Sequence, residues 1–206
     1  RALLLIHGLG GDENSHYIMA AVQYFLDKGW SVYRMNYRGV GPSKETSVAP
    51  YSAGLSDDLR SVLNVVAGDA EGKQLFAVGF SLGGQLLMRT LGEGNVTTAL
   101  CAAATVSAPL NLSNTLKKLQ RPRNGIYVRY LVQNMMRDLS DVGQHRFGVD
   151  RSKLTSVWAF DEYIIAPAFG FRDAEDYYEN VSCSPVLNDI SIPFLAIHSK
   201  DDPWIP

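Results

Sequence analysis

The 206-residue sequence has few of the features that mark special classes of protein. It has only two cysteines, Cys101 and Cys183, too few for a disulfide framework and not spaced as in a zinc site, so we expect two buried thiols. No apolar run approaches the roughly 20 residues of a membrane-spanning helix. A formal charge of −2 gives no overall basic character, which argues against nucleic acid as a partner. The composition, 46% hydrophobic and 19% charged, is that of a soluble globular domain.

Strand-like and helix-like segments alternate along the first half of the chain. Short apolar runs that end at a turn predict buried strands at 2–8, 30–37, 74–80 and 99–109. Helical spacing of apolar residues follows the first three of them, at 15–29, 54–69 and 82–92. This alternation predicts an α/β fold, a doubly wound and mostly parallel sheet with functional loops at the carboxyl ends of its strands.

Residues 111–182 interrupt the alternation. They hold a basic stretch and several aromatic residues but no clear strand, so we expect a helical cap or lid inserted into the domain. The alternation returns at 192–206, a short strand followed by an acidic turn. We therefore predict one domain over residues 1–206. Because a strand begins at once, we expect that domain to be incomplete, truncated at both ends.

The sequence Gly79-Phe80-Ser81-Leu82-Gly83 lies where a predicted strand meets a predicted helix. A serine between two glycines in this setting is typical of a nucleophile elbow, because glycine has no Cβ atom to clash in the sharp turn. We therefore predict that Ser81 is a nucleophile and that the backbone N–H of Leu82 donates to an oxyanion.

Two further groups complete the predicted site. The loop "HGLGG" follows an earlier strand, and we expect the backbone N–H of Leu9 to be the second oxyanion donor, with His7 holding the loop rather than acting on substrate. The acid that orients a catalytic base belongs after a late strand, where Asp201 and Asp202 precede Pro203. We predict Asp202 as this acid, with Asp201 as the alternative.

Together these motifs resemble the α/β-hydrolases. The segments "LIHGLGG", "NYRGVGPS", "GFSLGGQ" and "IHSKDDPWIP" carry the general resemblance. A signature similar to the YheT-like branch narrows it, through Asp161, Gly170-Phe171, Asp176-Tyr177-Tyr178, Ser182, Ile190, Pro193 and Asp201-Asp202. The resemblance covers nearly the whole chain.

The resemblance implies esterase or lipase activity on carboxylic esters, either short- or medium-chain acyl esters or glycerolipids, without metal or cofactor. It carries the nucleophile to Ser81 and the acid to the Asp201-Asp202 pair. The triad histidine does not carry over, because only four residues follow Asp202 and none is histidine. His16, His145 and His198 are poor replacements by position. We expect the chain to be an internal fragment whose catalytic histidine lies beyond residue 206, and the isolated fragment to be a weak enzyme.

A basic segment suggests a second kind of partner. Residues 117–153 contain nine Lys or Arg and three Asp, a local charge of about +6 in a chain of −2. With Tyr127, Tyr130, Met135 and Met136 among them, these residues could hold the cap against anionic lipid headgroups. A solvated amphipathic face is the simpler interpretation.

Two other functions remain open from the sequence. One is a non-catalytic α/β-hydrolase-fold module that binds a ligand or protein, which the missing histidine favours. The other is an acyltransferase that uses the same serine. The sequence leaves open the oligomeric state, the acyl length and the compartment, cytoplasmic or membrane-associated through a segment outside this chain.

Overall fold

A computed structural model describes residues 1–47, 49–139 and 148–206. Its centre is a parallel five-stranded sheet with strand order β2-β1-β3-β4-β5. The strands are β1 (Ala2–Ile6), β2 (Ser31–Met35), β3 (Leu75–Phe80), β4 (Leu100–Val106) and β5 (Phe194–Ile197). The predicted parallel α/β class is confirmed.

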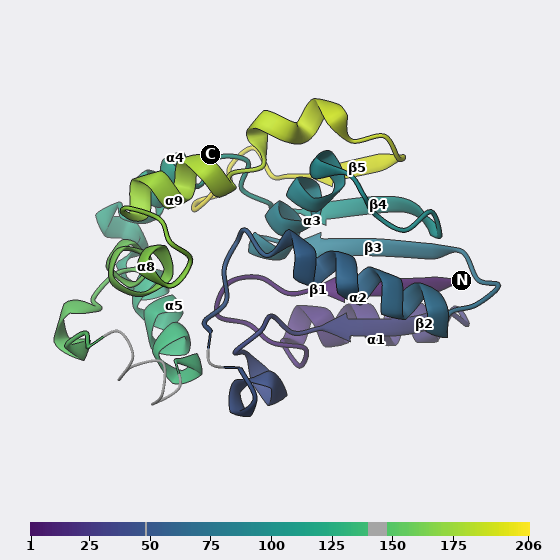
Figure 1. The fold of residues 1–206 in the computed structure, drawn as a ribbon, viewed down its shortest axis with the longest axis horizontal. Coiled ribbons are helices and arrows are strands. Elements are labelled where there is room, and N and C mark those ends of the chain that lie inside the picture. Colours follow the sequence, from purple (N-terminus) through teal and green to yellow (C-terminus); the bar gives the residue numbers. More distant parts are fainter. Residues whose placement is uncertain (48, 140–147) are drawn as a thin grey trace.

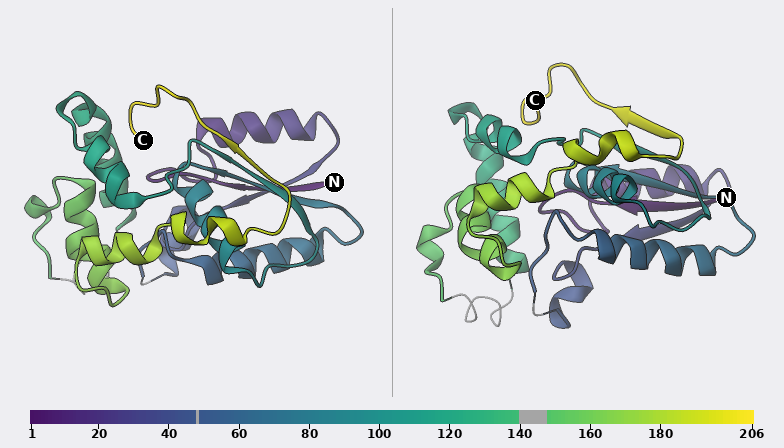
Figure 2. Two further views of the ribbon diagram at one scale, coloured as in Figure 1. Left: turned by 90° about the horizontal axis from the view of Figure 1, so that it is seen from above. Right: turned by 45° about the horizontal axis from the view of Figure 1, so that its top comes forward.

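Helices cover both faces of the sheet. Helix α1 (His16–Leu26) lies on one face and α2 (Ser56–Asp69) on the other (Figure 2), with α3 (Leu82–Glu93) packed beside α2. All five residues of β1 are buried, because its alternating side chains meet both layers. Leu3 and Leu5 pack with Ile18 of α1, whereas Leu4 and Ile6 join the larger core that contains α2 and α3.

The register aligns the carboxyl ends of four strands. Ile6 pairs with Gly79, Phe80 with Val106, and Val106 with Ile197. The residues that follow these strands therefore emerge at one edge of the sheet, which is where parallel α/β folds place functional loops.

A helical segment joins β4 to β5 and lies beyond this edge (Figure 1). Its α-helices are α4 (Leu112–Leu119), α5 (Gly125–Asp138), α7 (Val157–Phe160), α8 (Ala166–Ala168) and α9 (Ala174–Val181), with a π-helical turn at Asp161–Ile165. Three short 3₁₀ turns also lie between β4 and β5, at Pro122–Asn124, Arg151–Lys153 and Ser184–Asp189. Another follows β2, at Gly41–Glu45. Between Asn111 and Ser182, the part that the structure describes contains no strand.

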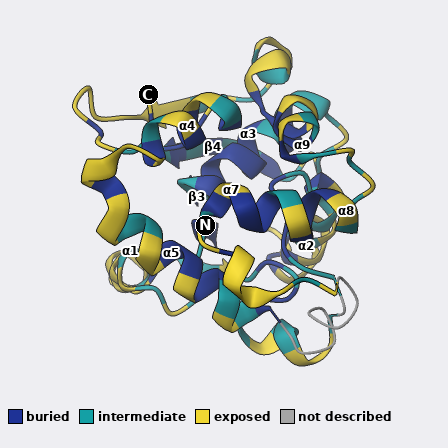
Figure 3. Ribbon diagram, turned by 90° about the vertical axis from the view of Figure 1, so that its left-hand side faces the viewer, coloured by how far each residue is buried: buried dark blue, intermediate teal, exposed yellow. Residues whose placement is uncertain are grey.

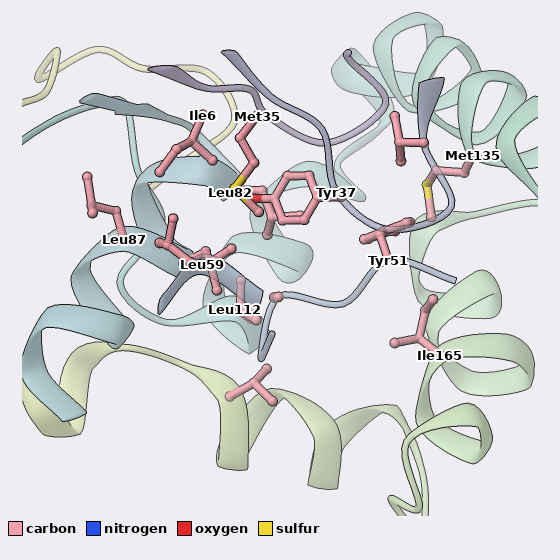
Figure 4. Close-up of a cluster of buried hydrophobic side chains, with 14 of the residues drawn as sticks. Ile6, Met35, Tyr37, Tyr51, Leu59, Leu82, Leu87, Leu112, Met135 and Ile165 are labelled. Atoms are coloured by element: carbon pink, nitrogen blue, oxygen red, sulfur yellow. The ribbon is translucent and has the colours of Figure 1, made fainter. Parts of the chain in front are cut away.

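Buried side chains connect the helical segment to the sheet. Tyr37 and Tyr51, from loops after β2, share one apolar cluster with Leu82, Met135 and Ile165 (Figure 4). Exposed positions lie mainly at the periphery, while α3 and α7 are largely buried and β3 and β4 contain only buried and intermediate residues (Figure 3). The sheet and the helical segment therefore share one apolar core.

Several signature residues tie the helical segment together. The Tyr178 hydroxyl donates to buried Asp161 at 2.7 Å, and the Tyr177 hydroxyl accepts from the Ala53 N–H at 2.8 Å. The Ser182 hydroxyl accepts from the Leu112 N–H at 3.0 Å and donates to the Tyr178 carbonyl at 2.6 Å. These positions hold the segment together and, through Tyr177, attach it to the loop before α2.

Two local predictions need correction. Cys183 is buried, but Cys101 in β4 is only half-buried. The strand predicted at 30–37 ends at Met35, since the chain turns there and carries Tyr37 into the core.

Candidate active site

Ser81 occupies the single residue between β3 and α3. Its φ of 50° and ψ of −119° lie in a region that residues with a Cβ atom rarely adopt, at a cost of order 1–3 kcal/mol. Its N–H donates to the Val106 carbonyl at 2.9 Å, which fixes the turn against β4. The serine thus stands at a strained strand-to-helix junction, the geometry expected of a nucleophile elbow.

The neighbouring glycines are required by close packing. A Cβ atom on Gly79 would lie 2.4 Å from the Gly83 carbonyl oxygen. A Cβ atom on Gly83 would lie 2.5 Å from the carbonyl oxygens of both Ile6 and His7. Side chains at either position would separate α3 from β3 and β1, so the glycine spacing seen in the sequence allows the elbow to form.

Ser81 lines a cavity of about 620 Å³ between the sheet edge and the helical segment. Residues after β1, β3 and β4, one face of α5, and the carboxyl-terminal turn 202–205 form its walls. Its lining includes Leu9, Ser81, Ser107, Tyr127, Asn134, Asp202 and Trp204. In the described parts of the chain, no side chain hydrogen-bonds to the Ser81 hydroxyl.

The two backbone amides predicted as oxyanion donors belong to Leu9 and Leu82. Leu9 lines the cavity, and Leu82 is the first residue of α3. Among residues 1–47, 49–139 and 148–206, neither amide N–H has a hydrogen-bond acceptor. The loop that carries Leu9 is closed by a bond from the Gly11 N–H to the Gly8 carbonyl at 3.2 Å, and the Gly8 N–H donates to the Tyr17 hydroxyl at 2.9 Å.

The two aspartates of the carboxyl-terminal turn have different surroundings. Asp202 is 9% exposed and lines the cavity. Its Oδ1 accepts from the N–H groups of Trp204 and Ile205, both at 2.8 Å. Asp201 is exposed and accepts from the Ser199 hydroxyl, which lowers the pKa of its carboxyl. Of the pair, Asp202 is the residue that shares a cavity with Ser81.

The histidines that the structure describes differ in burial and in their distance from the cavity lining. His7 is buried, its Nδ1 donates to the Gly8 carbonyl at 2.8 Å, and burial lowers its pKa, so its ring is neutral and holds the loop backbone. His16 is exposed at the start of α1 and lines the cavity. His198 lies just after β5, and it is exposed. His145 lies outside the described residues.

Sequence patterns had not pointed to Ser107, and they had singled out Tyr127 and Tyr130 only as possible contacts with lipid headgroups. Ser107 follows β4 with a φ of 48°, and its N–H donates to the Ile197 carbonyl at 2.9 Å. The five residues of α5 that line the cavity are Tyr127, Tyr130, Leu131, Asn134 and Arg137. Their spacing of three and four marks one helix face, but the sequence does not say what that face meets.

The His, Cys, Asp and Glu side chains of the described residues form no group of three that could hold a metal ion. None of their helices combines the length and the apolar content that a membrane crossing needs.

The chain matches known proteins along its full length. The family model described as Hydrolase_4, serine aminopeptidase, S33, matches residues 1–206. The YheT protein of Escherichia coli (strain K12) is 32% identical over 98% of this chain and 62% of its own length. A monoacylglycerol lipase of Saccharomyces cerevisiae is 28% identical over 98% of this chain and 48% of its own length.

The solved structures agree on the fold. An acylaminoacyl peptidase in complex with Z-Gly-Gly-Phe-chloromethyl ketone superposes with a TM-score of 0.60 at 17% identity, over 100% of this chain and 28% of that chain. This likeness shows the fold alone. The chain spans about half the length of the curated relatives it matches. With its elbow serine, its parallel sheet and this full-length match, the chain belongs to the Hydrolase_4 (serine aminopeptidase, S33) family of α/β-hydrolases.

Proposed function

We propose that this domain hydrolyses carboxylic esters, with Ser81 as the nucleophile. The observation that carries the proposal is the strained Ser81 in the same cavity as Asp202. Relatives named as a monoacylglycerol lipase and a phospholipase support lipid esters or short- and medium-chain acyl esters as the substrate class.

In the proposed reaction, the Ser81 Oγ attacks the ester carbonyl carbon while a general base takes its proton. The amides of Leu9 and Leu82 stabilise the charge that develops on the carbonyl oxygen. The alcohol leaves with a proton from the base, and water then attacks the acyl-enzyme and releases the acid. Asp202 orients the base and stabilises its charged form.

We propose that the base is a histidine outside residues 1–206. In this fold the triad residues follow the chain order serine, acid, histidine, which would place the histidine after Asp202. The places of His7 and His198 support this assignment, because neither side chain lines the cavity that contains Ser81. His16 does line the cavity, so it is the replacement to be tested.

The first experiment measures turnover of p-nitrophenyl acetate and butyrate by the full-length protein. Ser81→Ala should lower kcat/KM by at least about 10³-fold, and a fluorophosphonate probe should label the wild type but not the variant. Unchanged turnover in Ser81→Ala would refute the assignment. A protein that neither turns over esters nor reacts with the probe would be a non-catalytic binding module, whereas ester products formed with an added alcohol would indicate an acyltransferase.

The fluorophosphonate probe also tests which histidine is the general base. Residues 1–206 alone should react with the fluorophosphonate far more slowly than the full-length protein, because Ser81 would lack its base. Equal labelling rates, abolished by His16→Ala, would instead assign the base to His16.

We further propose that residues 111–182 form a cap and that its basic part contacts anionic lipid. Four exposed cations lie along α4, the link to α5, and α5, and none forms an ion pair with another described residue: Lys117, Arg121, Arg123 and Arg129. Cations placed this way favour peripheral binding to negatively charged membranes. Co-sedimentation should show stronger binding to vesicles with anionic lipid than to neutral ones, and equal binding would end this proposal.

A further inference from the structure

Ser107 shares the strained backbone conformation of Ser81. Within the described residues, three residues other than glycine have a positive φ: Ser81 at 50°, Asn95 at 58° and Ser107 at 48°. Asn95 is exposed in the loop after α3, whereas both serines line the cavity. Strained positions of this kind persist only where the surrounding structure fixes them, and they cluster at functional sites. The strain at Ser107 therefore suggests a role in the cavity.

The sheet places Ser107 directly beside Ser81. Phe80 of β3 pairs with Val106 of β4, and the Ser81 N–H donates to the Val106 carbonyl at 2.9 Å. The two serines follow these paired residues, so their backbones lie about 5 Å apart, the spacing of neighbouring strands. The Ser107 N–H donates to the Ile197 carbonyl of β5 at 2.9 Å. This bond holds Ser107 between the nucleophile and the last strand of the sheet.

The strand order gives the two sides of Ser81 different tasks. Leu9 follows β1 on one side, and the proposed reaction uses its amide for the carbonyl oxygen. Strands β4 and β5 lie on the other side, and Asp202 follows β5. Because Asp202 orients the base in the proposed reaction, the base approaches Ser81 from this side. A water that gives its proton to the base must lie on the same side, next to Ser107.

The Ser107 hydroxyl is suited to bind such a water. Across residues 1–47, 49–139 and 148–206 it has no hydrogen-bond partner, and the residue is half-buried. The end of β4 contributes Val106 and Ser107 to the cavity lining, and only the serine of these two carries a polar side chain. A serine oxygen accepts hydrogen bonds through two lone pairs. It can therefore accept from one proton of a water while the base takes the other.

We propose that the Ser107 hydroxyl binds the water that hydrolyses the acyl-enzyme. The inference rests on the proposed ester hydrolysis at Ser81 and adds a catalytic residue to it. The water oxygen attacks the acyl carbon, one water proton goes to the base, and the other stays on the oxygen, hydrogen-bonded to the Ser107 Oγ. The bond between the acyl carbon and the Ser81 Oγ then breaks, and the base returns its proton to that Oγ. Ser107 itself gains and loses no proton.

The test measures acylation and deacylation separately in the full-length protein with p-nitrophenyl butyrate. The burst of p-nitrophenolate reports acylation, and intact-protein mass spectrometry reports loss of the butyryl group after excess substrate is removed. Ser107→Ala should slow deacylation by about 5- to 10-fold, the factor for losing one hydrogen bond, and leave acylation within about 2-fold. Because deacylation then limits turnover, kcat and KM should fall together while kcat/KM stays unchanged.

Ser107→Gly separates the loss of the hydroxyl from the strain. Glycine adopts a positive φ readily and also lacks the hydroxyl, so this variant should slow deacylation as much as Ser107→Ala does. Asn95→Gly is the matched control, because it relieves the same strain outside the cavity lining and should leave both steps unchanged.

Two results would overturn the inference and leave the proposed function standing. One is deacylation within about 2-fold of the wild-type rate in both Ser107 variants, since a hydrogen bond to the water would then be absent. The other is equal slowing of acylation and deacylation, which would mean that Ser107 acts on the base or on Ser81 and not on the water. If the wild type forms no acyl-enzyme, the proposed function fails and the inference fails with it.

Discussion

Replacing Asp161 with asparagine should change how the stability of this domain depends on pH. Asp161 is 5% exposed inside the helical segment, and burial raises the pKa of its carboxyl to about 7, although the hydrogen bond from Tyr178 lowers it. Tyr51 and Tyr177 also face it, and burial raises the pKa of both phenols, so they supply no charge near neutral pH. Asparagine keeps an acceptor for the Tyr178 hydroxyl but cannot ionise.

The magnitude follows from the two pKa values of Asp161. The folded protein holds the proton with a pKa of about 7, whereas the ordinary value is 3.8. Protonation therefore favours the folded state, and this stability is present at low pH and lost as the pH rises through 7. Between pH 5 and pH 8 the loss from this single group is about 2 to 3 kcal/mol. The Asp161→Asn variant lacks that loss.

The assay is urea unfolding of wild type and variant at pH 5 and pH 8. The free energy of unfolding should fall by about 2 to 3 kcal/mol more in the wild type than in Asp161→Asn over this interval. Asp189→Asn, at an exposed position, is the control and should follow the wild type. Parallel pH profiles for wild type and Asp161→Asn would refute the reasoning, because they would mean that this carboxyl does not titrate differently on unfolding.

Two further substitutions test the active-site geometry. Gly83→Ala should destabilise the protein by about 3 kcal/mol in thermal or urea unfolding, because its Cβ atom meets two backbone carbonyl oxygens that cannot move aside, while Gly68→Ala in α2, with open space around it, should stabilise by about 0.5–1 kcal/mol. If Gly83→Ala unfolds at the wild-type midpoint, the described packing of α3 on β1 is wrong. Asp202→Asn should lower kcat/KM for p-nitrophenyl butyrate by about 10³- to 10⁴-fold, and Asp201→Asn should change it by less than about 3-fold. The reverse order would transfer the role of the acid to Asp201.

The sequence by itself determined the features that depend on local patterns. Apolar runs and helical spacing predicted the alternating strands and helices, because each pattern has a period of a few residues. The glycines around Ser81 predicted the elbow for the same reason: the turn that needs them is formed by adjacent residues. The roles of Ser81, Asp202, Leu9 and Leu82 stay predictions, which the proposed experiments test.

The tertiary structure decided what depends on residues far apart in the chain. Tyr127 meets Trp204, and Asp161 meets Tyr178, only after α5, the π-helical turn and the carboxyl-terminal turn have packed around the sheet edge. The difference between Asp201 and Asp202 is likewise a matter of which side chain faces the cavity, and neighbouring residues in a turn look alike in sequence. Local patterns select the elements, but the contacts between elements depend on how whole faces fit together.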